Sequence, residues 1–222
     1  MNATCVVDAR TLGEGCVWDP RDESLYWTDI EESRIYRLSA EQSVTSFNLP
    51  ERAGFILPRK DTGFIVGLAT RIVRFDPEFS RFETIIEVES ALPQTRVNDA
   101  AVDPFGGIVF GTFDERDRKP VASLYRLSPK GKLSLLFANV TISNGIAFSS
   151  DGAIMYFADT PIGVIRRFKV GPNFSSLAEL ALLAEADIGP DRPTGQSLTA
   201  KAVTEVRVCG ADVSCVFLRT GK

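Results

Sequence analysis

The 222-residue sequence contains no histidine. This absence excludes Ser-His-Asp triads, histidine general bases and the usual histidine-rich zinc sites. Any acid–base or metal chemistry must therefore use carboxylates, amides and water. The four cysteines show no CxxC spacing and predict buried or incidental thiols in a reducing compartment instead of a disulfide framework. They are Cys5, Cys16, Cys209 and Cys215.

The sequence also lacks an excess of positive charge and long apolar runs. Its formal net charge is −4, which gives no electrostatic footprint for nucleic acid. No stretch holds the roughly 18 apolar residues that a membrane span needs. Residues 1–5 lack the basic segment and apolar core of a secretory signal. We therefore expect a cytoplasmic protein with a small-molecule partner and with no nucleic-acid or membrane partner.

The sequence does contain a repeat of short aromatic and β-branched runs bounded by Asp-Pro, Asp-Gly and Gly-Gly turns. The repeat occurs at residues 17–38, 101–127 and 146–168, with a weaker copy at 63–77. Such runs predict strands, and a repeat of about 40–50 residues indicates propeller blades. The predicted fold is all-β with four blade-like units. A β-sandwich is the alternative, but it does not predict the recurring turns. Residues 175–186 fit either a helix or a blade-connecting loop with an outer strand.

Two short polar motifs each precede a strand-like run. Glu14 lies in Leu-Gly-Glu-Gly at residues 12–15, and Asn144 lies in Ser-Asn-Gly at residues 143–145. Glutamate and asparagine supply hard oxygen ligands, and the neighbouring glycines allow a close approach of backbone and ligand, as a divalent metal requires. The motifs together indicate a metal site, whereas either motif alone also fits a residue that caps a turn.

Several ordered motifs carry a family resemblance over about residues 10–190. They are the motif at 12–15 with Trp-Asp-Pro at 18–20, Arg-Val-Asn-Asp at 96–99 with Val-Asp-Pro at 102–104, Gly-Thr-Phe at 111–113, and residues 143–148 with Asp-Gly at 151–152. With these motifs the sequence resembles the regucalcin/gluconolactonase family of six-bladed propellers, which are metal-dependent enzymes that hydrolyse sugar lactones. Cys16, Ala100 and Phe113 depart from the usual family residues, and none of the three removes a ligand.

The resemblance implies roles for five side chains. Glu14 and Asn144 are implied ligands of one divalent metal ion, which is Ca, Zn, Mg or Mn. Asn98 is implied to lie by the metal and the substrate, and Arg96 to contact substrate oxygens. Glu115 is a weaker candidate for a substrate contact. The alternatives are a surface ion pair for Arg96, a turn at residues 98–99, and a solvated charged loop around Glu115.

The family pattern ends after Pro190, where members carry a Pro-Asp-Gly motif whose aspartate is the third protein ligand. Here Thr194 takes that place, so the family carboxylate is lost. Back-translation with a one-base shift permits family-like sequence over residues 193–199 and 206–222. We therefore expect an incomplete propeller of about four blades over residues 1–190 and an out-of-frame, poorly ordered tail over 191–222. The alternative is an evolved terminal strand pair.

Three functional hypotheses remain at this point. The first is metal-dependent hydrolysis of sugar lactones, crippled if the tail is out of frame. The second is a calcium- or metal-binding propeller without turnover, which uses the same ligands. The third is a propeller that only binds partner molecules. It is disfavoured, because Glu14 and Asn144 would then need no metal.

Overall fold

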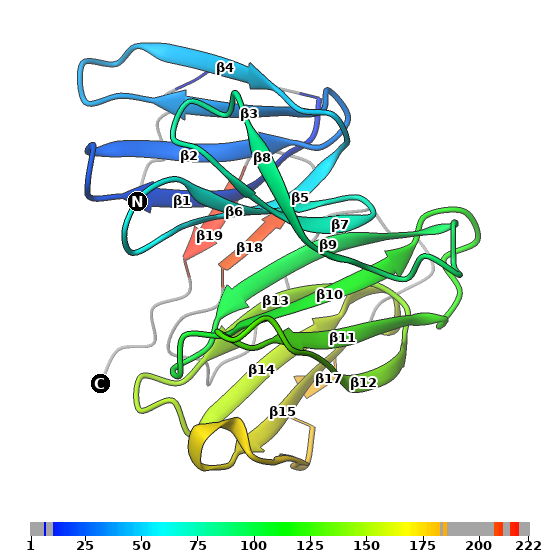
Figure 1. Ribbon diagram of the computed structural model, residues 1–222. Coiled ribbons are helices and arrows are strands. Elements are labelled where there is room, and N and C mark those ends of the chain that lie inside the picture. Colours follow the sequence, from blue (N-terminus) through cyan, green and yellow to red (C-terminus); the bar gives the residue numbers. More distant parts are fainter. Residues whose placement is uncertain (1–6, 8–10, 183, 186–206, 211–213, 218–222) are drawn as a thin grey trace.

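Four antiparallel sheets follow one another along the chain, and each sheet has its strands in sequence order (Figure 1). The computed structural model describes residues 7, 11–182, 184–185, 207–210 and 214–217. Blade 1 contains β1 (Gly13–Asp19), β2 (Ser24–Asp29), β3 (Arg34–Leu38) and β4 (Val44–Asn48). Blade 2 contains β5 (Ala53–Pro58), β6 (Phe64–Leu68), β7 (Arg71–Phe75) and β8 (Phe82–Glu87). Blade 3 contains β9 (Thr95–Val102), β10 (Ile108–Asp114), β11 (Ala122–Leu127) and β12 (Leu133–Val140). Blade 4 contains β13 (Ser143–Phe148), β14 (Ile154–Asp159), β15 (Val164–Val170) and β16 (Leu177–Glu179).

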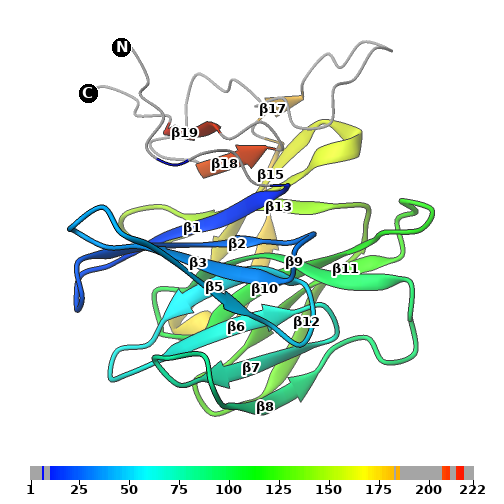
Figure 2. The same cartoon turned by 90° about the horizontal axis from the view of Figure 1, so that it is seen from above.

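The first strand of each blade lies on the inside of the arrangement. Strand β1 contacts β5, β5 contacts β9, and β9 contacts β13, so the four inner strands surround a common centre (Figure 1). Figure 2 shows the same sheets turned by 90°. This is the all-β architecture of an incomplete propeller with four blades, as the strand repeat predicted. The weaker sequence copy at residues 63–77 forms the middle of a complete four-stranded blade.

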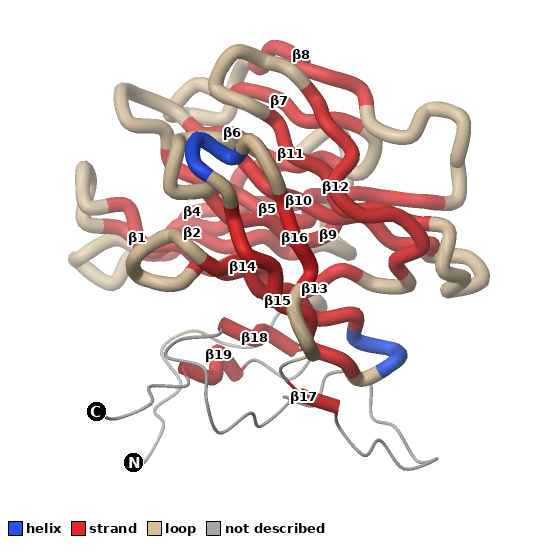
Figure 3. Tube along the Cα trace, turned by 90° about the horizontal axis from the view of Figure 1, so that it is seen from below, coloured by secondary structure: helices blue, strands red, loops and turns tan. Residues whose placement is uncertain are grey.

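The described residues contain little helix (Figure 3). The two helical turns are short 3₁₀ segments, η1 (Thr160–Ile162) and η2 (Pro172–Phe174). The segment 175–186, which fitted either a helix or an outer strand, supplies β16 as the outer strand of blade 4, and β17 (Ala184–Glu185) pairs with β15. No helix among the described residues has the length and apolar character that crossing a bilayer demands.

The core lies between neighbouring blades, because alternate side chains on each strand face the adjacent sheet. The ring centres of Tyr26 in blade 1 and Phe64 in blade 2 lie 4.8 Å apart, and those of Phe55 in blade 2 and Phe110 in blade 3 lie 6.4 Å apart. Phe157 of blade 4 belongs to the same apolar cluster as Val109 and Leu124 of blade 3, and this cluster fills the space between the two blades. Burying each large side chain contributes about 1.5–3 kcal/mol, so these apolar layers fix the angle between sheets.

In blades 1 and 4, a buried aspartate at the end of the second strand binds the backbone just before the first strand of the same blade. Asp29, which ends β2, accepts hydrogen bonds from the backbone N–H groups of residues 11 and 12. Asp159, which ends β14, accepts hydrogen bonds of 3.1 Å from the N–H groups of residues 141 and 142. These contacts satisfy backbone donors that would otherwise be unpaired, and they set the starting positions of β1 and β13.

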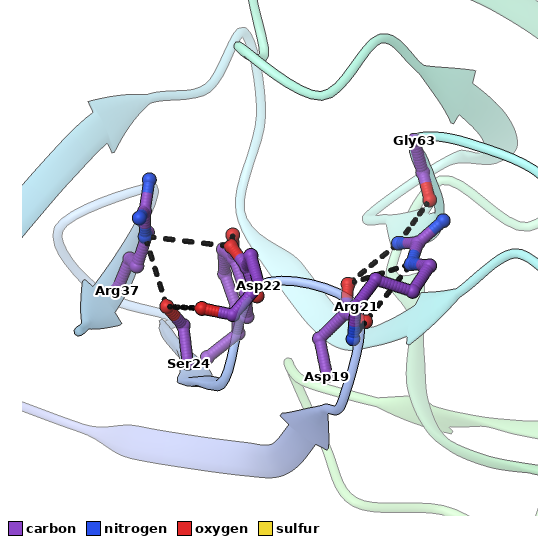
Figure 4. A network of polar contacts seen from close by, with 7 residues as sticks. Asp19, Arg21, Asp22, Ser24, Arg37 and Gly63 are labelled. Atoms are coloured by element: carbon purple, nitrogen blue, oxygen red, sulfur yellow. Dashed lines mark hydrogen bonds and ion pairs between the residues drawn. The ribbon is translucent and has the colours of Figure 1, made fainter. Parts of the chain in front are cut away.

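At the opposite ends of the inner strands, polar contacts join the first two blades (Figure 4). Arg21 pairs with Asp19 at 2.5 Å and donates a hydrogen bond of 3.2 Å to the backbone carbonyl of Gly63 in blade 2. The side-chain hydrogen bond from Arg21 lowers the pKa of Asp19, despite the opposing effect of burial. The turn between β1 and β2 is thereby held against blade 2.

Two further strands, β18 (Arg207–Gly210) and β19 (Ser214–Phe217), form an antiparallel pair, and β18 contacts both β1 and β13. Most of residues 191–222 lie outside the described part of the chain. The prediction of an out-of-frame tail therefore stays a prediction.

Candidate functional site

The centre of the site is formed by irregularities in the inner strands. The pairing of β1 with β2 shifts between Glu14 and Val17, and the pairing of β13 with β14 shifts between Asn144 and Ala147. In both strands the candidate ligand is followed by a glycine with a φ of 61°. Residues other than glycine rarely adopt this backbone conformation. Such bulges bend a strand and redirect its side chains. Glu14 and Asn144 therefore occupy matching places in blades 1 and 4.

Both residues line one small pocket of about 150 Å³ where inner strands meet. Strand β5 contributes Phe55 and Ile56 to the wall, and β9 contributes Asp99. The structure thus brings a carboxylate and an amide oxygen to the same hollow, although they are far apart in the sequence. The alternative that Glu14 and Asn144 cap turns is wrong, because both lie within strands.

A continuous chain of hydrogen bonds leads from blade 3 into blade 4. The Arg96 Nη1 group donates to Asn98 Oδ1 at 2.9 Å, and the Asn98 Nδ2 group donates to Asn144 Oδ1 at 2.9 Å and to the Ser143 carbonyl at 2.9 Å. Asn144 Nδ2 in turn donates to Thr160 Oγ1 at 2.9 Å. Both candidate amides are therefore held in fixed orientations. Each hydrogen bond in this series restricts the orientation of the next side chain.

Arg96 is the buried cation of the site, with only 6 % of its side chain exposed. Its Nε group donates to Glu115 Oε1 at 2.8 Å, and its guanidinium lies 4.3 Å from the centre of the Phe113 ring. Burial lowers the pKa of Arg96, while the negative charges of Glu115 and Glu14 oppose that shift. The alternative of a surface ion pair is wrong, because the guanidinium is almost fully covered.

Arg52, which precedes β5 in blade 2, is a site residue that the sequence reasoning did not identify. Its Nη1 and Nη2 groups donate to the two oxygens of Glu115 at 2.8 and 2.5 Å. No local motif could have revealed this pair, because its members are 63 residues apart. The alternative of a solvated loop at Glu115 is wrong for this side chain, of which 26 % is exposed and both oxygens are paired.

Asp99 connects blades 3 and 4 beside the pocket. Its carboxylate accepts a hydrogen bond of 2.8 Å from the N–H of Ala100 and one of 3.1 Å from the N–H of Ile146. Burial raises the pKa of Asp99 to about 6, against the effect of these backbone hydrogen bonds. The alternative of a turn at residues 98–99 is wrong, because both lie in β9.

The residues that could hold a metal are Glu14 and Asn144. Their donors are hard oxygens, and Asn144 Oδ1 accepts one hydrogen bond from the residues that the structure describes, so its second lone pair suits a cation. Within the described part of the chain, no group of three or more His, Cys, Asp or Glu side chains gathers into a metal-binding cluster. The position of Thr194 lies outside the described residues.

Known proteins with related sequences and structures include lactonases and regucalcins. The chain is 39 % identical to the L-arabinolactonase of Azospirillum brasilense over 197 residues, which cover 85 % of this chain and 65 % of that protein. A solved luciferin-regenerating enzyme superposes with a TM-score of 0.74 at 26 % identity, covering 79 % of this chain and 61 % of that chain. The calcium-binding protein regucalcin from Agrobacterium tumefaciens superposes with a TM-score of 0.69 at 30 % identity, covering 72 % of this chain and 55 % of that chain.

The chain therefore spans between 55 and 65 % of the length of these three proteins. A family model described as the SMP-30/gluconolactonase/LRE-like region matches residues 12–218. Because this match extends over most of the sequence, the chain belongs to the SMP-30/gluconolactonase/LRE-like family.

Proposed function

We propose that this protein carries the site of a metal-dependent hydrolase of sugar lactones. The observation that supports the proposal most directly is the linkage of Arg96, Asn98 and Asn144 by hydrogen bonds beside a pocket that Glu14 also lines. Glu14 supplies a charged acceptor and Arg96 a cation, and the two asparagines supply oriented amides. Such a set of groups suits a small polar ligand with several oxygen atoms. A relative at 39 % identity is named a lactonase.

The donor set fits a divalent ion of the hard type. Glu14 and Asn144 would hold it, and Asn98 would fix the amide of Asn144 in the ligating orientation. When bound, such an ion polarises the carbonyl of a lactone and stabilises developing negative charge. We propose calcium, zinc, magnesium or manganese for this place, because one carboxylate and one amide oxygen do not discriminate among these four ions.

The chain's own residues would bind and orient the lactone. The Nη2 group of Arg96 has no hydrogen-bond partner among the described residues, so it can donate to a substrate oxygen. The Oδ1 atom of Asn98 can accept from a substrate hydroxyl while it keeps its bond to Arg96. In the family pattern, the carboxylate that removes a proton from water is the aspartate of the Pro-Asp-Gly motif. Thr194 stands in its place here, so we expect slow turnover.

The test compares acid release from gluconolactone and L-arabinonolactone by the purified chain, with and without chelator. The Glu14→Gln variant removes the pocket carboxylate, and Glu41→Gln, at an exposed position in blade 1, is the matched control. We expect a low rate above the uncatalysed reaction that chelator and Glu14→Gln both remove and Glu41→Gln leaves unchanged. A rate that survives both treatments would refute the metal-dependent mechanism.

A second candidate is a metal-binding propeller without turnover. The similarity to a solved protein described as calcium-binding regucalcin favours it. Calorimetric binding of Ca²⁺ that depends on Glu14, together with no acid release from any lactone, would establish this alternative.

The tail and the location remain proposals from the sequence. We propose that residues 191–222 are translated out of frame and that residues 1–190 form the propeller domain. Resequencing the coding DNA around codon 191 tests this directly, since an unshifted frame in an independent clone would refute it. We also propose a cytoplasmic location, which fractionation of cells that express the protein would test.

A further inference from the structure

Two arginines from different blades share the single carboxylate of Glu115. Arg52 occupies both oxygens, at 2.8 and 2.5 Å, while Arg96 reaches only Oε1 through its Nε group. The two cations differ in exposure, because 36 % of the Arg52 side chain is exposed and only 6 % of Arg96 is. Arg52 therefore lies on the outer side of the carboxylate, and Arg96 lies on the buried side.

The charges of this group do not cancel. Arg52 and Glu115 form a bidentate pair, which is the strongest geometry for a guanidinium and a carboxylate. Glu115 is thereby shared between two guanidinium groups, so these three side chains carry one net positive charge, on which the negative charge of Glu14 also acts at Arg96. Arg96 is next to the pocket, since it donates to Asn98, which donates to the pocket residue Asn144. Its Nη2 group has no partner among the described residues.

We propose that Arg52 is a positioning residue that sets the charge preference of this site. By holding Glu115, it leaves the positive charge of Arg96 for the carboxylate of a ring-opened sugar acid, and it weakens the attraction of the site for divalent cations. The inference rests on the proposed function, because a sugar acid is what hydrolysis of a sugar lactone yields. Arg52 acts through Glu115 and need not touch the ligand.

Removal of Arg52 should change the two affinities in opposite directions. Without it, Glu115 is free to pair with Arg96 through both oxygens, and the site becomes more negative by one charge. A change of one charge at a partly exposed site corresponds to about a threefold to tenfold change in binding constant. The effect should decrease at high salt, because ions screen the Arg52 charge. Loss of structure would instead weaken every ligand.

The experiment uses the full chain and three variants. Arg52→Met keeps the length of the side chain without its charge, and Arg52→Lys keeps the charge without the bidentate geometry. Arg59→Met is the matched control, because Arg59 follows β5 as Arg52 precedes it, and it pairs with Asp61 at 2.6 Å. Calorimetry measures the Kd of gluconate, of the neutral analogue gluconolactam, and of Ca²⁺ without sugar.

We expect Arg52→Met to weaken gluconate about threefold to tenfold, to leave gluconolactam within about twofold, and to tighten Ca²⁺. Arg52→Lys should recover part of the gluconate affinity, and Arg59→Met should resemble the unchanged chain. The proposal is wrong if Arg52→Met weakens all three ligands equally, changes none of them, or has the same effect as Arg59→Met.

The result also separates this proposal from the proposed function. If the unchanged chain binds Ca²⁺ but neither sugar, lactone hydrolysis fails as a function, and tighter Ca²⁺ binding by Arg52→Met still supports the role of Arg52. If the chain binds both sugars but the Arg52→Met variant keeps its Ca²⁺ affinity and its preference between gluconate and gluconolactam, only the role of Arg52 is refuted. A chain that binds none of the three ligands would overturn both.

Discussion

Asn98 in blade 3 donates a hydrogen bond of 2.9 Å to the side chain of Asn144 in blade 4. This contact joins a candidate substrate residue to a candidate metal ligand across the boundary between two sheets. Its geometry depends on the angle at which the blades pack, so local conformation alone cannot produce it. We therefore expect the stability of the blade boundary to be coupled to the metal binding proposed for the pocket.

Replacement of Asn98 by alanine should weaken both properties. The variant loses the hydrogen bonds to Asn144 and to the Ser143 carbonyl, and we expect unfolding to become easier by about 1–3 kcal/mol. Affinity for Ca²⁺ should fall about 10–100-fold, because the ligating amide is no longer held. Urea unfolding and calorimetry measure the two effects. Asn48→Ala, which removes only an exposed hydrogen bond of 3.0 Å from Arg34, should lower the free energy of unfolding by less than about 1 kcal/mol and leave the Ca²⁺ affinity unchanged.

Replacement of Gly54 by alanine should destabilise the contact between β5 and β9. A Cβ atom at this position would lie 2.1 Å from the Asn98 carbonyl oxygen, so the strands would have to move apart. We expect a loss of about 1–3 kcal/mol in the free energy of unfolding. The control is Gly13→Ala, whose Cβ would meet its nearest side chain at 3.8 Å. Equal urea midpoints for the two variants would contradict the close approach.

Asp99 should titrate near pH 6 in metal-free protein. Its pKa is raised from 3.8 to about 6, so the folded state binds the proton more tightly than the unfolded state. This contribution to stability is therefore largest below pH 4, declines as the pH rises to 6, and is constant above that, with a total of about 3 kcal/mol.

Side-chain carboxyl NMR measures this titration without interference from imidazole, since the sequence has no histidine. Asp19 is the internal control, because its pKa is lowered by Arg21. A midpoint for Asp99 at or below that of Asp19 would show that the backbone hydrogen bonds outweigh burial.

If residues 191–222 are translated out of frame, as proposed, restoration of the reading frame should raise metal-dependent turnover. A carboxylate in place of Thr194 adds an anionic ligand and a candidate general base, and the added length supplies further blades. We expect the rate of acid release from gluconolactone to rise at least about tenfold and to be lost on chelation. Equal, chelator-sensitive rates in the two chains would show that the tail does not limit activity.

Much of the fold could be predicted because it depends on local patterns. The predicted repeat at residues 17–38 contains β2 and β3 in full, and the repeat at 146–168 contains β14, since alternating side chains and bounding turns specify a strand within a few residues. The segment 175–186 could not be decided in this way. Its composition suits a helix, and only pairing with β15 selects a strand.

Only part of the membership of the candidate site could be predicted from the sequence, because Arg52 was missed. Glu14, Asn98 and Asn144 were named from motifs, but the bulges that redirect the strands and the 2.9 Å contact between the amides depend on pairing with other strands.

The sequence by itself determined an all-β repeat and an acidic chain without imidazole chemistry, because residue types and their period of two are local properties. Tertiary structure alone decided that Arg52 shares Glu115 with Arg96. These residues come from two blades, and their distances are set by the packing of whole sheets against each other.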